Sequence, residues 1–147
     1  MYSPRWQSPE YLEGKEYATA TDVFSFGVVL WEVVTLQTPW ESELHQYENK
    51  GLKVLEPVFI HEEVVTKNKR LAFPEPATLE PALPELAQLV ALCERCWHKD
   101  PRSRPRMTEL QRRGGLQGRV RRAQLIRLVF LLQPLQWRQL VRLSRQQ

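Results

Sequence analysis

The sequence has little cysteine, and we expect neither a signal segment nor a membrane-spanning run in it. Cys93 and Cys96 are its two cysteines, and no second CxxC pair or neighbouring histidine pair accompanies them to complete a zinc site. Met1 is followed by a polar, proline-containing stretch where a signal peptide would have an apolar core. No apolar run approaches the roughly 20 residues that span a bilayer. We therefore expect a cytoplasmic protein without a bound metal, whose cysteines pack on a helix face.

Acidic residues and lysine are missing from the end of the chain. Residues 111–147 contain nine arginines and no Lys, Asp or Glu, whereas residues 1–110 contain 12 basic and 17 acidic residues. The formal charge of +4 therefore combines a body of charge −5 with a tail of charge +9. Any attraction to anionic surfaces must come from this tail. In length and composition the chain otherwise fits one soluble globular domain.

The longest apolar segment of the body predicts a buried helix. Residues 23–36, VFSFGVVLWEVVTL, are apolar on nearly every helical face, which is typical of a core helix. Thr19 and Thr21 are candidate N-caps. A strand is the competing interpretation, because the segment has five valines, but its length favours a helix. Upstream, a structured loop leads into a short helix at about Pro9–Glu13, which Gly14 ends.

The rest of the body is predicted to consist of short helices. Residues 37–84 contain six prolines and should be loops joining short helices, one of them near residues 61–68. Apolar residues recur at helical spacing from about Pro84 to Trp97. Residues 100–105, DPRSRP, are expected to form a turn that leads into a helix over residues 106–113. Four acids are expected to be solvated: Glu41, Glu43, Glu62 and Glu63.

Three segments carry a resemblance to a known family. Residues 5–10 read RWQSPE, residues 21–28 TDVFSFGV and residues 96–105 CWHKDPRSRP. In this order and at these spacings they resemble the A-P-E motif, the central helix and the last loop of the protein kinase C-terminal lobe, in its tyrosine-kinase-like, serine/threonine group. The resemblance implies a mainly α fold, a partial kinase C-lobe without the N-lobe. It assigns residues 1–113 to this lobe and leaves residues 114–147 as a basic tail, helical or disordered.

The resemblance implies structural roles for four residues. Glu10 and Arg104 are expected to form a largely buried ion pair that ties the activation segment to the last helices. In the family, the aspartate at the position of Asp22 holds the catalytic loop, whose motif does not occur here. We therefore expect Asp22 to act as an acid at a helix start. Trp97, in the family's Cys-Trp pair, is expected to be structural.

Ser3, Pro4, Arg5 and Trp6 are similar to the strip that receives the substrate residue following the phosphoacceptor; we call these four residues the substrate strip. Serine/threonine kinases usually carry a hydroxyl residue at the position of Ser3, where tyrosine kinases carry proline. The resemblance thus implies a kinase that phosphorylates serine or threonine, with tyrosine left open as a further substrate. The alternative is that Ser3 simply belongs to a frayed N-terminus.

The motifs that bind ATP and transfer phosphate do not occur in the sequence. Kinases need a glycine-rich loop, a strand lysine, an H-R-D loop and a D-F-G aspartate for Mg²⁺, and none is found. No catalytic, cofactor-binding or metal-binding residue is therefore assigned, although the family uses ATP and Mg²⁺. We expect a kinase fragment that is inactive alone. The alternative is a non-catalytic module that binds a protein.

The same resemblance predicts an exposed apolar patch and leaves the tail open to several interpretations. Elements that would cover the central helix are missing, so we expect a patch bearing residues such as Phe24, Phe26 or Trp31, and limited solubility. The partner would be a protein, either a substrate or the missing kinase half.

The tail could make weak contacts with an anionic membrane or phosphate, or have no selected role. Only Phe130 and Trp137 could stack on bases, so sequence-specific nucleic-acid binding is not expected.

Overall fold

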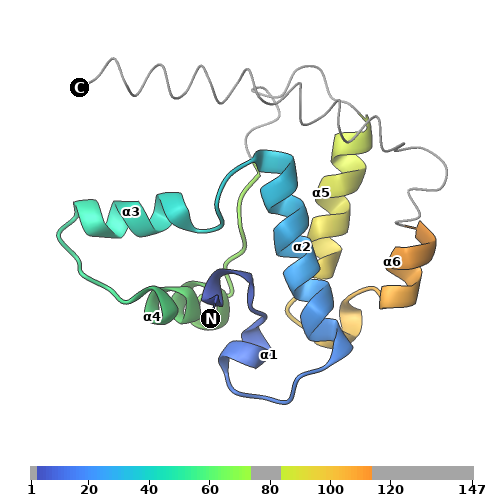
Figure 1. The fold of residues 1–147 in the computed structure, drawn as a ribbon, viewed down its shortest axis with the longest axis horizontal. Coiled ribbons are helices and arrows are strands. Elements are labelled where there is room, and N and C mark those ends of the chain that lie inside the picture. The colour runs from blue at the N-terminus through green and yellow to red at the C-terminus, as the bar shows by residue number, and fades with distance from the viewer. Residues whose placement is uncertain (1–2, 74–83, 114–147) are drawn as a thin grey trace.

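The computed structural model describes residues 3–73 and 84–113, and over these ranges it is mainly helical, without a strand. The resemblance to a partial kinase C-lobe predicted this fold class. Figure 1 shows the arrangement of the elements. In chain order they are η1 (Pro4–Trp6), α1 (Pro9–Leu12), α2 (Thr19–Thr35), α3 (Glu41–Asn49), α4 (Glu56–His61), η2 (Glu62–Thr66, a π-helical turn), α5 (Pro84–Cys96), η4 (Pro101–Ser103) and α6 (Met107–Arg113).

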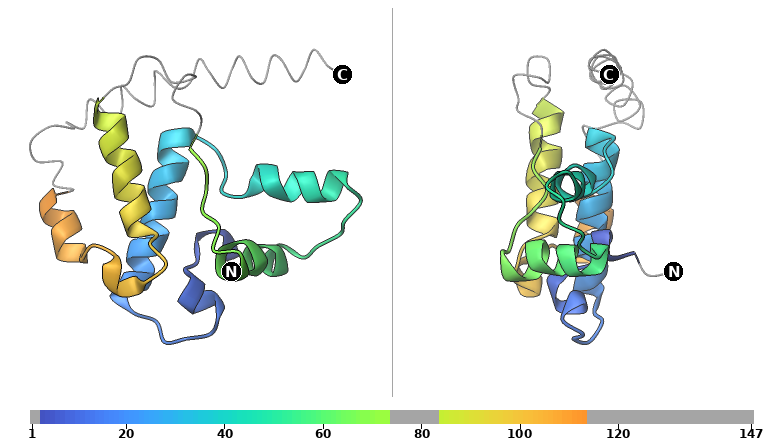
Figure 2. Two further views of the ribbon diagram at one scale, coloured as in Figure 1. Left: turned by 180° about the vertical axis from the view of Figure 1, so that it is seen from behind. Right: turned by 90° about the vertical axis from the view of Figure 1, so that its left-hand side faces the viewer.

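Helices α2 and α5 lie side by side and form the centre of the lobe (Figures 1 and 2). Gly27 of α2 makes this close approach possible, since a Cβ added at this position would lie 2.7 Å from Cys96 Cβ. Cys93 and Cys96 are buried and form no disulfide. Burial raises the pKa of the Cys93 thiol to about 12 and that of Cys96 to about 11.

The helical prediction for the central segment is confirmed, but its N-terminus differs from the expectation. Helix α2 begins at Thr19, so Ala18 occupies the N-cap position and neither threonine is the cap. The Thr21 hydroxyl, at the third helical position, instead accepts a hydrogen bond from the backbone N–H of Ala18 at 3.3 Å. Thr21 thus stabilises the start of α2 from inside the first helical turn, and the helix begins upstream of the apolar segment.

The core lies on one side of α2, and the opposite side is open. Phe24, Val28 and Trp31 are buried among side chains of α3, α4, η2 and α5. The expectation that Phe24 and Trp31 would be exposed is therefore wrong, whereas Phe26 is exposed. The reason is the helical period, which turns Phe26 about 160° away from the core-facing residues.

Three further predicted helices are found, and one is displaced. Helix α1 is followed by Gly14 with φ +73°. Helix α5 lies where the apolar spacing placed it, and α6 lies after the turn at residues 100–105, as expected. The helix expected near residues 61–68 begins earlier, at Glu56, with Pro57 in its first turn, and continues into η2. The tail, with the helix that its pattern favours, lies outside the described residues. Within those residues, no helix is long and apolar enough to cross a membrane.

Candidate functional site

The first half of the candidate site is an ion pair that joins the two ends of the described chain. Arg104 Nη1 lies 2.6 Å from Glu10 Oε1, and Nη2 lies 2.9 Å from Glu10 Oε2, a bidentate arrangement. The Arg104 side chain is 0% exposed and that of Glu10 is 13% exposed. The guanidinium also donates to the carbonyls of His98 at 2.9 Å and Ala20 at 2.8 Å. This pair fixes α1 to the start of α2 and to the η4 loop.

The surroundings of Glu10 favour its charged form. Burial alone would raise the pKa of this carboxyl, but hydrogen bonds from Arg104, from the backbone and from Ser8 outweigh burial and hold the pKa below its usual range. The Thr21 hydroxyl donates a further hydrogen bond to Glu10 Oε1 at 3.4 Å. Glu10 is therefore a structural anion at neutral pH.

A half-buried arginine that the sequence analysis did not single out, Arg70, shares the Phe24 ring with Arg104. The guanidinium carbons of Arg70 and Arg104 lie 5.2 and 5.1 Å from the ring centroid of Phe24. Arg70 donates to the carbonyls of Trp97 at 2.8 Å and Val64 at 3.2 Å. Burial, and then the nearby positive charge of Arg104, lower the pKa of Arg70 to about 10. No sequence spacing indicates this contact, because it joins segments far apart in the chain.

The second half of the candidate site is the substrate strip, which forms η1 and the residue before it. Ser3 is exposed at the N-cap of η1, and Pro4 is buried. Arg5 Nη2 lies 2.8 Å from Glu56 Oε2 at the start of α4, and Arg5 Nη1 donates to the Pro39 carbonyl at 3.3 Å. The strip is therefore anchored to the loop before α3 and to α4.

Helix α2 holds the other side of the strip. The Trp6 indole Nε1 donates to Glu32 Oε2 at 3.0 Å. The Trp6 carbonyl accepts a hydrogen bond from the Ser25 hydroxyl at 2.8 Å. Glu32 and Ser25 are two turns apart on one face of α2, so the central helix sets the orientation of the strip.

Asp22 and Trp97 lie apart from the strip. Asp22 is exposed in the first turn of α2 and accepts a hydrogen bond from the Tyr17 hydroxyl. This placement agrees with an acid at a helix start. Trp97 is buried, its carbonyl accepts from Arg70, and its ring centroid lies 6.0 Å from that of Phe73. The structure therefore places Trp97 in the core and Asp22 at the surface.

The expectation that Glu63 is solvated is wrong. Its side chain is buried, with Oε1 2.7 Å from Lys67 Nζ and Oε2 3.1 Å from Lys69 Nζ. The π-helical turn η2 directs this carboxylate inward, where two lysines cover it. The i,i+4 spacing of Glu63 and Lys67 is the sequence signal that could have indicated the pair. Glu62, beside it, is exposed.

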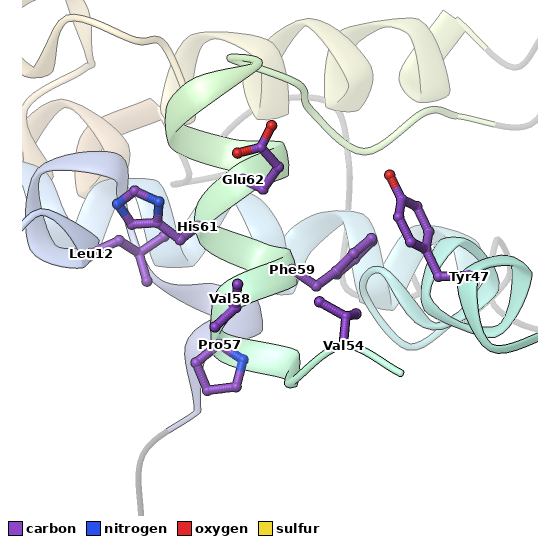
Figure 3. A pocket seen from close by; sticks show the side chains of 8 residues that line it. All are labelled: Leu12, Tyr47, Val54, Pro57, Val58, Phe59, His61 and Glu62. Carbon is purple, nitrogen blue, oxygen red and sulfur yellow. The ribbon is translucent and has the colours of Figure 1, made fainter. Parts of the chain in front are cut away.

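A shallow apolar pocket of about 500 Å³ lies around α4, next to the strip (Figure 3). Arg5 connects the strip to this region through Glu56, the residue before Pro57. The Tyr47 and Phe59 rings meet edge to face with centroids 5.1 Å apart. The lining residues come from α1, α3, the loop after α3, α4 and η2: Leu12, Tyr47, Val54, Pro57, Val58, Phe59, His61 and Glu62.

Metal ligands do not gather in this part of the chain. Among the described residues, no group of three or more His, Cys, Asp or Glu side chains could hold a metal ion.

The structure is a helical lobe. A strip is fixed to its central helix, and an arginine–glutamate pair joins its two ends. This arrangement defines the class of the protein as a kinase C-lobe fragment. The family described as protein tyrosine and serine/threonine kinase matches residues 1–113. The chain belongs to this family.

Curated relatives include both serine/threonine and tyrosine kinases. A probable serine/threonine-protein kinase of Dictyostelium discoideum is 36% identical over 74% of the chain and 10% of its own length. The serine/threonine/tyrosine-protein kinase HT1 of Arabidopsis thaliana is 35% identical over 71% of the chain and 22% of its own length. Vascular endothelial growth factor receptor 1 of Mus musculus is 35% identical over 72% of the chain and 6% of its own length. The chain therefore spans a quarter or less of these relatives.

Proposed function

We propose that this chain is the part of a protein kinase domain that positions the protein substrate, and that it does not transfer phosphate alone. The observation that carries this proposal is the fixed substrate strip, held by Glu56 through Arg5 and by Glu32 and Ser25 through Trp6. A segment held by α4 through Arg5 and by α2 through Trp6 is preorganised to receive an extended peptide.

The complete domain would transfer phosphate from ATP to serine or threonine hydroxyls of proteins. Two observations support this specificity. Ser3 stands where tyrosine kinases carry proline, and the Dictyostelium relative is named a probable serine/threonine-protein kinase. ATP and Mg²⁺ would be bound by motifs that these 147 residues do not contain.

The test joins residues 1–113 to the N-terminal part of the Arabidopsis kinase HT1 catalytic domain, in place of its matching segment. We expect this chimera to phosphorylate serine peptides in the presence of ATP·Mg²⁺. The 147-residue chain alone should show neither ATP-induced thermal stabilisation nor phosphate transfer. Ser3→Pro in the chimera is the matched variant, and it should shift the preference toward tyrosine peptides.

Either of two results would contradict the proposal. Phosphate transfer by the chain alone would show that catalysis does not need the missing motifs. A folded chimera without activity would show that residues 1–113 do not serve as a kinase lobe.

We further propose a cytoplasmic location and a protein partner, either a substrate or the rest of a kinase domain. The alternative function is a non-catalytic module that binds a protein through its surface, with the basic tail adding weak contacts to a partner or to an anionic membrane. The apolar pocket around α4 favours this second function, because Val58 in its lining is 57% exposed. Capture of a protein by the chain in the absence of any kinase half, abolished by Val58→Asp, would support it.

A further inference from the structure

An exposed apolar segment runs from the connection between α3 and α4 into the first turn of α4. Leu52, Leu55 and Val58 are 52%, 74% and 57% exposed, and Leu55 is the most exposed of the large apolar side chains in the described ranges. The connection lies at the edge of the lobe, on the opposite side from α5 and α6 (Figures 1 and 2). Exposed apolar side chains that gather in one segment mark an interaction site.

Local structure does not explain the leucine at position 55. Leu55 occupies the N-cap position of α4, with φ −70° and ψ 132°, and its side chain makes no capping hydrogen bond. Serine, threonine, aspartate and asparagine are the residues that stabilise this position, because their side chains accept a hydrogen bond from the first helical turn. An exposed leucine at this position breaks a capping rule and a burial rule together, which is typical of a functional surface.

The apolar pocket around α4 lies directly beside this leucine. Val54, Pro57 and Val58 line the pocket (Figure 3), whereas Leu55 does not. Its volume of about 500 Å³ falls in the range of roughly 300–1,000 Å³ that proteins use for small ligands, so a leucine side chain fits into it. One surface thus carries an apolar projection and an apolar hollow within three sequence positions of each other.

A projection and a hollow on the same surface are what a two-fold contact between identical chains needs. In such a contact each copy contributes the same patch, so Leu55 of one copy enters the pocket of the other, and the reverse contact forms at the same time. Because the projection and the hollow are neighbours, a single two-fold axis satisfies both contacts. The assembly therefore closes at a dimer and does not continue into a filament.

The charges around this surface favour the same occupant. Glu48 at the end of α3 and Lys50 and Lys53 after it are exposed, and none of the three forms an ion pair within the described ranges. A second copy brings both an anion and cations to this surface, so each sign meets its opposite across the axis. A partner of one charge sign would leave the other sign unpaired.

We propose that two copies of this chain form a symmetric dimer through this surface, with Leu55 of each copy in the α4 pocket of the other. This inference goes beyond the proposed kinase role, which concerns the substrate strip. It concerns association alone, so phosphate transfer by the chimera neither supports nor contradicts it.

Photo-crosslinking of the full chain tests the contact. Leu55→p-benzoylphenylalanine should crosslink to the pocket lining of a second copy, mapped by mass spectrometry on a mixture of ¹⁴N-labelled and ¹⁵N-labelled chains, which separates crosslinks between copies from those within one copy. Val29→p-benzoylphenylalanine, at an apolar position of α2 that is 44% exposed, is the control and should not reach the pocket. Circular dichroism checks the fold of both variants.

Analytical ultracentrifugation measures the dissociation constant of the dimer. Leu55→Asp should raise this constant by about 30-fold or more, which is the effect of losing a residue that dominates an interface. Val29→Asp makes the same change at another exposed apolar position and should leave the constant unchanged. If Val29→Asp, and not Leu55→Asp, dissociated the chain, the contact would lie on α2 and the proposal would be overturned.

The chimera of residues 1–113 with the N-terminal part of the HT1 catalytic domain supplies a second measurement. Its N-terminal part would cover the open side of α2, and it lacks residues 114–147. A dimer of the chimera that Leu55→Asp dissociates therefore comes from the α3–α4 surface. A folded chimera that is monomeric, a full chain that is monomeric, or crosslinks from position 55 that miss the pocket of the second copy would each overturn the proposal.

Discussion

Replacing Glu10 by glutamine tests the energetics of the ion pair that joins the ends of the lobe. The substitution keeps the size of the side chain and removes the charge that faces Arg104, whose side chain is 0% exposed. A buried charge without its partner costs about 3–5 kcal/mol. We expect the lower value, about 3 kcal/mol, since the glutamine oxygen can still accept one hydrogen bond.

The assay is urea unfolding at pH 7, followed by tryptophan fluorescence and circular dichroism. A loss of about 3 kcal/mol is a large share of the roughly 5–15 kcal/mol that stabilises a typical domain. Arg104→Met and the double variant complete a double-mutant cycle, in which the double variant should lose less stability than the sum of the single variants. If each single variant lost less than about 1 kcal/mol of unfolding free energy, and these losses added in the double variant, the pair would behave like an exposed one. That result would refute the reasoning.

The same pair predicts a dependence on pH. The folded-state pKa of Glu10 is lowered, while the unfolded value is about 4.3. The charged pair therefore contributes its full stability above about pH 4.3, and this contribution is lost as the pH falls through the folded pKa. The difference in unfolding free energy between the wild-type chain and Glu10→Gln should narrow below about pH 4.

Three further substitutions or measurements test the interior. Gly27→Ala should destabilise the chain by about 1–3 kcal/mol in urea, because its Cβ would meet Cys96 Cβ at 2.7 Å; Cys96→Gly should restore part of the loss, and a neutral effect would contradict the close approach of α2 and α5. Glu63→Gln should lower the urea midpoint more than Glu62→Gln, because Glu63 is buried between two lysines; equal effects would contradict its burial. At pH 8, Cys93 and Cys96 should react with a thiol reagent only after unfolding, since burial raises the pKa of each thiol; rapid reaction of the folded chain would contradict this.

The pattern of apolar residues was sufficient for most helices of the body. A long apolar run located α2, apolar spacing located α5, the turn at residues 100–105 located α6, and proline and glycine positions located α1. The start of α4 was missed because Pro57 was read as a loop residue, although proline suits the first helical turn. Between residues 37 and 73, the positions of proline were thus a poorer guide to helix boundaries than the apolar residues were elsewhere in the body.

The site was only partly accessible from the sequence. The resemblance brought Glu10 and Arg104 together, although 94 positions separate them. The partners of the strip, Glu56 and Glu32, and the stacking of Arg70 on Phe24 were not foreseen. Each of these contacts joins residues from different elements, and no local spacing encodes them.

The sequence by itself determined the family and the helical class of α2, because these depend on motif order and on the length and apolar character of the segment. The tertiary structure decided which side of each helix packs against other elements and which side stays exposed. Folding buried Glu63 next to two lysines, brought two guanidinium groups to the Phe24 ring and left Phe26 exposed. The physical reason is that burial and ion pairing depend on neighbours brought together by folding, and a linear pattern does not specify which neighbours those are.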